Sequence, residues 1–240
     1  AEGEVHTRQQ REQARLPLSA RYSAGEPWGT RQERLTGRPL AAGLDFEMMV
    51  PEDFWDELAR GTTVSAESLA TLPQGVAVSP AWVERIAASA AAHGTSWLHE
   101  LALATALLDR GDRDGARAHV ERSLSLRPNW AAYRLRALMT DDADRASADY
   151  LRAWQAGGAP AELAVEIATH FMRAERAADL KTFVEALPEE IGSNERIVLA
   201  RAVVAADAGR FDELERLLLS RQFATIREGE TLLSDLWDRL

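Results

Sequence analysis

The stretch that decides the fold is LALATALLDRGDRDGARAHVERSLSLRP, residues Leu101–Pro128. Its apolar residues recur every three to four positions on both sides of Gly111, a spacing that predicts two amphipathic helices with a turn between them. Small residues such as Ala104 let one helix approach its partner, and larger ones such as Val120 fill the space beside them. We therefore predict a pair of packed helices here.

The same pattern returns along the chain in three parallel sets of residues, which we call the three ladders. Within each ladder the positions advance by 30, then 34, then 34 residues. Three series with the same steps indicate an internal repeat, and the short first step fits a tight turn at Asp141-Asp142. The first ladder is Leu107, Ala137, Phe171 and Ala205; the second is Ala116, Ala146, Leu180 and Leu214; the third is Val120, Tyr150, Val184 and Leu218.

On these residues the chain resembles the tetratricopeptide-repeat (TPR-like) family, whose repeat of about 34 residues forms two antiparallel helices. The resemblance covers about residues 96–222. The second repeat departs from it at Arg134, where a small residue is expected, and the third lacks the Gly between its helices. The resemblance implies an all-α fold, a right-handed superhelix of about four TPR-like helical hairpins with a capping C-terminal helix and an irregular N-terminal segment.

Composition changes near residue 76. Residues 1–75 hold five of the nine prolines, and we expect an irregular segment or linker there with one short helix, Pro51–Arg60, that places Phe54, Trp55 and Leu58 on one face. Residues 76–240 read as the α-helical repeat domain. Its ends need covers, for which we predict Pro80–Ala92 and Thr231–Leu240, the latter burying Leu232, Leu233, Leu236 and Trp237.

Charge and composition exclude several classes of protein. The 28 basic and 38 acidic residues give a net charge of −10, which disfavours nucleic acid as a partner. The absence of Cys excludes disulfides, thiolate zinc sites and cysteine nucleophiles. No apolar run approaches the roughly 18–20 residues of a membrane helix and no leader opens the chain, so we expect a soluble, cytoplasmic protein without membrane contact.

No motif points to catalysis, a cofactor or a metal. The five histidines show no His-x-x-x-His or His-Glu-x-x-His spacing, and neither a Gly-x-Ser-x-Gly elbow nor a phosphate-binding loop occurs. Adjacent carboxylates point in different directions on a helix and form no acid–base pair by themselves. We expect Trp82, Trp97, Trp130 and Trp154 to pack in the core, whereas Trp28 in its Gly-Pro turn either fills a core or contacts a partner. We therefore predict that the chain is not an enzyme.

The repeat pattern also predicts a binding face. It directs toward the concave side the residues Leu101, Thr105, Leu108, Leu135, Leu138, Met139, Thr169, Met172, Arg173, Leu199 and Val203. This face is mainly apolar with Arg173 as its only cation, so it lacks the basic cluster that clamps acidic chaperone tails in some TPR domains. An apolar groove needs a cover, either the chain's own segment around Leu44–Trp55, which we favour, or a segment of another protein.

Two other stretches, Tyr22–Leu35 and Phe223–Trp237, resemble a bacterial family that joins a mutarotase-like β-sandwich domain of unknown function to TPR-like repeats. This resemblance implies that the chain is the C-terminal part of a longer protein and that Trp28, Arg227, Glu228 and Glu230 contact the upstream domain; the last three also fit a simple break before the final helix. Two functions follow. The first is a non-catalytic interaction or scaffolding module. The alternative is an accessory region of a carbohydrate-active enzyme whose catalytic or sugar-binding β-sandwich is missing from this chain.

Overall fold

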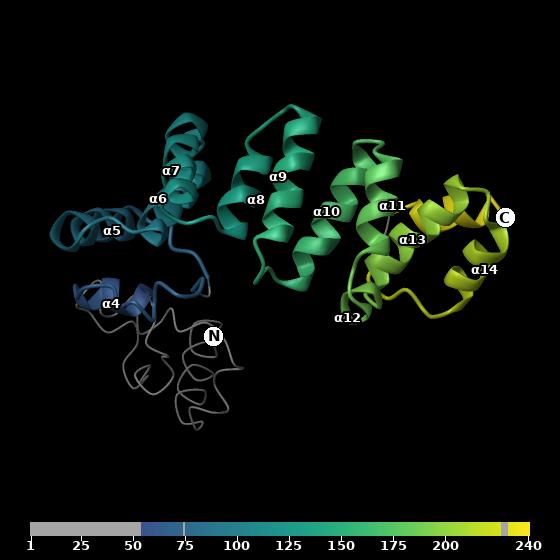
Figure 1. The fold of residues 1–240 in the computed structure, drawn as a ribbon, viewed down its shortest axis with the longest axis horizontal. Helices are drawn as coiled ribbons and strands as arrows, with labels where there is room; N and C mark the ends of the chain where they lie inside the picture. The colour runs from purple at the N-terminus through teal and green to yellow at the C-terminus, as the bar shows by residue number, and fades with distance from the viewer. Residues whose placement is uncertain (1–53, 74, 227–229) are drawn as a thin grey trace, which may run out of the picture. The chain divides into compact units, whose positions relative to one another are not determined.

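The computed structural model describes residues 54–73, 75–226 and 230–240. These residues form twelve helices and no strand, which confirms the all-α fold for the described part of the chain (Figure 1). The chain divides into two units, residues 1–127 and 128–240. The change of composition near residue 76 therefore falls inside the first unit.

The first unit contains four described helices that pack in chain order, α4 on α5, α5 on α6 and α6 on α7. The face predicted for the short helix is correct, because Phe54, Trp55 and Leu58 are all buried. The Trp55 ring meets Trp82 edge-on at 5.6 Å between centroids, and Phe54 meets His99 at 5.4 Å. The helices are α4 (Phe54–Arg60), α5 (Pro80–His93), α6 (Trp97–Asp109) and α7 (Arg113–Leu126).

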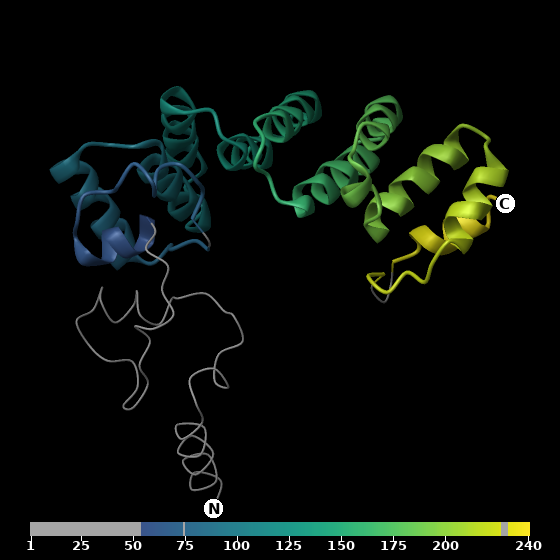
Figure 2. The same cartoon turned by 60° about the horizontal axis from the view of Figure 1, so that its bottom comes forward.

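The second unit contains eight described helices. The helices pack as α8 on α9, α9 on α10, α10 on α11 and α13, α11 and α12 on α13, and α13 on α14 and α15. Figures 1 and 2 show the helices of this unit following one another in chain order. The helices are α8 (Trp130–Leu138), α9 (Ala143–Gln155), α10 (Ala161–Arg173), α11 (Ala177–Glu185), α12 (Glu189–Gly192), α13 (Glu195–Asp207), α14 (Phe211–Leu219) and α15 (Leu232–Trp237).

The three ladders occupy equivalent places in four helix pairs. The first ladder lies on α6, α8, α10 and α13. The second and third ladders lie on the helix that follows each of these in the chain and packs on it, α7, α9, α11 and α14. Every ladder residue except the half-buried Leu107 is buried. The four tryptophans expected to pack also do so, since Trp82 and Trp97 are buried and Trp130 and Trp154 pack against the core of the second unit. The repeated spacing therefore marks the residues that form the core.

Three of the four turns share one geometry. The N–H groups of Asp112, Arg176 and Arg210 donate to the carbonyl oxygens of the first-ladder residues five positions earlier, each at 2.9 Å. The residue before each donor has a positive φ, 81° at Gly111, 54° at Glu175 and 67° at Gly209. This is the Schellman closure of a helix, which usually needs Gly at that position. The third pair thus keeps the turn although Glu175 replaces the Gly.

The turn of the second pair covers the same nine positions between the first and second ladders as the other turns, but none of its residues 139–142 has a positive φ. The Asp142 carboxylate accepts hydrogen bonds from the N–H groups of Asp144 and Arg145 at 3.0 and 3.1 Å, which caps α9 directly. The expectation that a tight turn at Asp141-Asp142 accounts for the short first step is wrong. The linker between α8 and α9 is no shorter than in the other pairs, and the step is short because α8 begins only seven residues before Ala137, whereas α6, α10 and α13 each begin ten residues before their ladder residue.

The side chain of Arg134 extends beyond its own helix pair, α8 and α9. Its Nε donates to Glu166 of α10 at 2.7 Å, and the Tyr150 hydroxyl donates to the other carboxylate oxygen at 2.9 Å. Burial, with this hydrogen bond, raises the pKa of Tyr150. The large side chain at a position expected to be small thus links α8 to α10.

The C-terminal cover is smaller than expected, because the helix spans Leu232–Trp237 rather than residues 231–240. Leu236 is buried, as predicted, whereas Leu232 and Leu233 are only half-buried against α13 and α14. The prediction that Trp237 is buried is wrong, since it is 41% exposed. Adjacent residues on a helix are rotated by about 100°, so a helix that buries Leu236 turns Trp237 away from the core.

Candidate functional site

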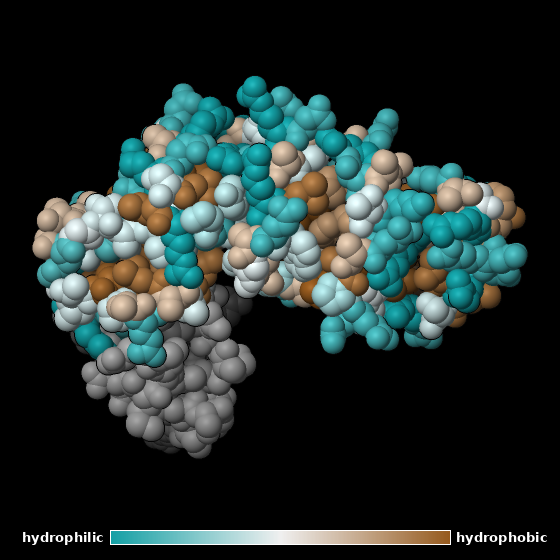
Figure 3. Space-filling view, in the orientation of Figure 1, coloured by the Kyte–Doolittle hydropathy of each residue, from teal (hydrophilic) through white to brown (hydrophobic). Residues whose placement is uncertain are grey.

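A cleft of about 770 Å³ lies in the second unit between α10, α13 and the C-terminal segment. We call it the α10–α13 cleft. From α10 it is lined by Val165, Thr169, Met172 and Arg173, from α13 by Arg196 and Leu199, and from the C-terminal segment by Thr225, Glu230, Thr231, Leu232 and Asp235. The cleft is mixed in character, because apolar side chains such as Val165 and Leu199 line it together with charged ones such as Arg173 and Glu230. The surface of the molecule is mixed as well, with brown apolar areas interrupted by teal hydrophilic side chains on the face that Figure 3 shows.

Four residues of the predicted binding face meet in this cleft: Thr169, Met172, Arg173 and Leu199. They come from two helices that are distant in the sequence but packed together. Val203, which belongs to the same predicted face, is half-buried and packs between the two apolar clusters of the unit. The helical spacing therefore brings part of the predicted face together as a surface that a ligand can reach.

The other residues of the predicted face lie on α6 and at α8. On α6, Leu101 is buried, and the half-buried Thr105 donates its hydroxyl to the Leu101 carbonyl at 2.9 Å. Leu108 is half-buried. At α8, Leu135 and Met139 are buried and Leu138 is 44% exposed. Leu135 and Met139 therefore belong to the core. Of the three residues of the predicted face at α8, only Leu138 is well exposed.

Arg196 is the best-held charged group of the cleft. Its guanidinium forms a two-point ion pair with Glu230, with one contact at 3.0 Å, and also donates to the Thr225 carbonyl. The neighbouring Glu195 accepts hydrogen bonds from the Thr225 N–H at 2.9 Å and hydroxyl at 2.8 Å. The hydrogen bond that Arg196 donates to Glu230 raises the pKa of Arg196, and the hydrogen bonds that Glu195 accepts from Thr225 lower the pKa of Glu195. Both groups are charged at neutral pH.

Arg173 contrasts with Arg196. It is exposed at the C-terminal end of α10, and no carboxylate among the residues that the structure describes pairs with it. Asp235, on the opposite wall, accepts a hydrogen bond from the Thr231 hydroxyl at 2.8 Å. The cleft therefore offers one cation to a ligand while its second cation is bound to the chain itself.

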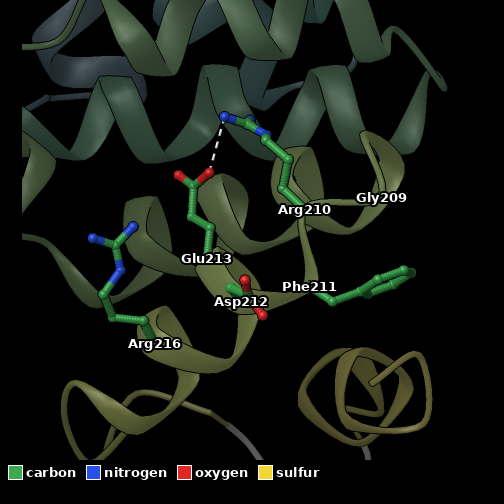
Figure 4. Close-up of a pocket in the computed structure, with 6 residues that line it drawn as sticks. All are labelled: Gly209, Arg210, Phe211, Asp212, Glu213 and Arg216. Atoms are coloured by element: carbon green, nitrogen blue, oxygen red, sulfur yellow. Dashed lines mark ion pairs between the residues drawn. The ribbon is translucent and has the colours of Figure 1, made fainter.

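A second hollow, of about 720 Å³, lies at the start of α14 (Figure 4). It is lined by Gly209, Arg210, Phe211, Asp212, Glu213 and Arg216, all from one turn and one helix. Arg210 pairs with Glu213 at 2.9 Å, and Phe211 extends away from that pair. Its lining comes from a single turn and helix, whereas three segments of the chain meet in the α10–α13 cleft, so this hollow is the weaker candidate.

The four histidines that the structure describes, His93, His99, His119 and His170, have structural partners. The His99 ring lies 2.7 Å from the Ser96 hydroxyl and 3.2 Å from that of Ser89, and burial lowers its pKa. His170 contacts the Ser147 hydroxyl at 2.9 Å. Within the described ranges, no group of three or more His, Cys, Asp or Glu side chains could hold a metal ion.

Sequence reasoning did not identify Arg196 as a cleft residue. It placed Glu230 in a contact with an upstream domain, together with Trp28, Arg227 and Glu228, whereas the structure joins Glu230 to α13 of its own unit. Those three residues lie outside the described part of the chain, and so do Leu44–Met49 of the expected groove cover. Phe54 and Trp55 of that cover pack within the first unit.

Comparisons with protein-family models, curated proteins and solved structures find no match for this chain. Across the part of the chain that the structure describes, none of the helices combines the length and the apolar character needed to cross a bilayer. The candidate function therefore depends on the geometry of the chain itself.

Proposed function

We infer that this chain is a non-catalytic, cytoplasmic protein–protein interaction or scaffolding module built from TPR-like repeats arranged as a right-handed superhelix. Three features support the repeat assignment: the ladders fall at equivalent places, three turns share one closure, and each second helix begins at the same offset from the ladder residue before it. Stacked units of this kind present faces to partners more often than they form reaction centres.

The α10–α13 cleft is the observation that carries this proposal. Its lining includes the aliphatic or thioether side chains of Val165, Met172 and Leu199, and the exposed Arg173 lies beside them. An apolar surface next to a cation suits an extended segment of a partner that carries an aliphatic side chain and a carboxylate. We take such a segment of another protein as the ligand.

A displayed library of random peptides, panned against the full chain, tests this proposal. We expect the enriched peptides to combine an acidic with an aliphatic residue. Because a hydrogen bond to a charged group contributes about 1.5–3 kcal/mol, Arg173→Glu should weaken binding by about tenfold or more. Arg216→Glu is the matched control, since Arg216 is also an exposed arginine but lies on α14 outside the cleft.

Two results would contradict the proposal. Failure to enrich any peptide would count against an interaction function. Enriched peptides that bind both arginine variants as tightly as the original chain would place the binding surface elsewhere. Urea midpoints of both variants show that the fold is retained.

A further inference from the structure

One wall of the α10–α13 cleft is made by the chain itself. We call Thr225 together with Glu230–Leu232 the C-terminal wall. All of these residues line the cleft, and Thr225 and Glu230 contact the first turn of α13. The contacts with α13 at this point are polar: Arg196 binds Glu230 and the Thr225 carbonyl, and Glu195 binds the Thr225 N–H and hydroxyl.

The polar contacts lie between two apolar anchors. Before the wall, Phe223 and Ile226 are half-buried against the cluster formed by α13 and α14. After it, Leu236 is 2% exposed in the same cluster. Between these anchors, the paired side chains are partly open to solvent, with Arg196 25% and Glu230 34% exposed. A carboxylate of a ligand can offer Arg196 the same two-point contact that Glu230 makes, so this part of the wall is the one that a ligand can replace by exchange.

The C-terminal wall also has the chemistry expected of a ligand. Glu230 places a carboxylate on a guanidinium of the cleft, and Leu232 places an aliphatic side chain beside Leu199 and its apolar cluster. While Glu230 is in place, only Arg173 is left for a partner's carboxylate. Once Glu230 is released, the same cleft presents two arginines.

We propose that the C-terminal wall is a built-in competitor of the partner segment, and that a carboxylate of the partner binds by replacing Glu230 on Arg196. This inference depends on the proposed interaction function and adds to it a regulating contact. A ligand that binds only the released form has its apparent affinity reduced by the fraction of molecules in that form. Loss of the Glu230 charge should therefore tighten binding of an acidic peptide.

The experiment uses the full chain and one enriched acidic peptide carrying a fluorescent label, with the dissociation constant read from fluorescence anisotropy. We expect Glu230→Gln to bind the peptide about three- to fivefold more tightly, the range set by a surface ion pair. Arg196→Gln should bind no more tightly than the original chain, because it also removes the contact for the ligand. Glu213→Gln is the matched control, since it breaks a similar surface pair, Arg210–Glu213, outside the cleft.

Amide hydrogen exchange supplies a second readout. The Thr225 N–H is hydrogen-bonded to Glu195, so its exchange should accelerate when the peptide displaces the wall. An unchanged peptide affinity of Glu230→Gln, or unchanged amide hydrogen exchange at Thr225 in the complex, would overturn the proposal that the C-terminal wall competes with the ligand. Either result would leave the interaction function standing. If neither the original chain nor Glu230→Gln binds any enriched peptide, the interaction function fails as well.

Discussion

Replacing Glu175 with Gly should stabilise the second unit. Glu175 has a φ of 54° and is the only non-Gly residue with a positive φ among those described. It ends α10 with the same closure that Gly111 and Gly209 provide after α6 and α13. No hydrogen bond or ion pair joins its exposed side chain to another described residue. The substitution therefore changes the backbone preference and little else.

The magnitude follows from two opposing effects. A left-handed backbone costs a non-Gly residue about 1–2 kcal/mol. Gly loses more conformational freedom on folding, which offsets about 0.5–1 kcal/mol of that gain. The net expectation for Glu175→Gly is a stabilisation of about 0.5–1 kcal/mol. Gly209→Ala should show the reverse, a loss of similar size, because a Cβ added there meets nothing within 4 Å and only the backbone strain counts.

Urea denaturation followed by far-ultraviolet circular dichroism measures both variants. Glu175 and Gly209 lie in the same unit, so both substitutions should move the same transition, in opposite directions and without a change in slope. If Glu175→Gly lowered the urea midpoint while Gly209→Ala also lowered it, the turns would not be equivalent and the common closure would not be the reason for the repeated spacing.

Three further predictions concern the interior. Burial lowers the pKa of His99 below its ordinary 6.5, so its contribution to stability is complete above that pH and is lost as the pH falls below it through the lowered pKa; His99→Asn should flatten this dependence of the urea midpoint. A double-mutant cycle on Arg134→Ala and Glu166→Ala should give a coupling of about 0.5–1 kcal/mol, whereas zero coupling would leave Arg134 unexplained. Leu180→Ala should cost about 2–5 kcal/mol of unfolding free energy, against less than about 0.5 for the exposed Lys181→Ala.

The core was the most predictable part of the structure, because residues that are buried at regular intervals appear as apolar residues at regular intervals in the sequence. The ladder residues Phe171, Leu180 and Val184 are each at most 2% exposed, as their spacing requires. The departure at Glu175 was also visible in the sequence, as a missing Gly. The sequence did not predict that the turn would persist without Gly. It persists because the packing of the flanking helices can hold a residue at a strained φ.

The charged part of the cleft was much less predictable. A salt bridge leaves no periodic signal, and Arg196 could pair with any of several carboxylates on neighbouring turns. The structure selects Glu230, which lies 34 residues further along the chain. Arg134 is a similar case, since its partner Glu166 belongs to the following helix pair. Side chains that connect neighbouring pairs therefore have to be located from coordinates.

The distance of 34 residues between Arg196 and Glu230 explains the form of the C-terminal cover. The same step leads from Ala168 on α10 to Ala202 on α13 and then to Leu236 on α15, and each of these residues is buried. As α10 packs on α13, so α13 packs on α15. Val203 packs between two apolar clusters, and the residue 34 positions after it is the exposed Trp237. Leu236 and Trp237 of α15 thus repeat the places of Ala202 and Val203 on α13, one in the core and the other at its edge, where Trp237 is 41% exposed.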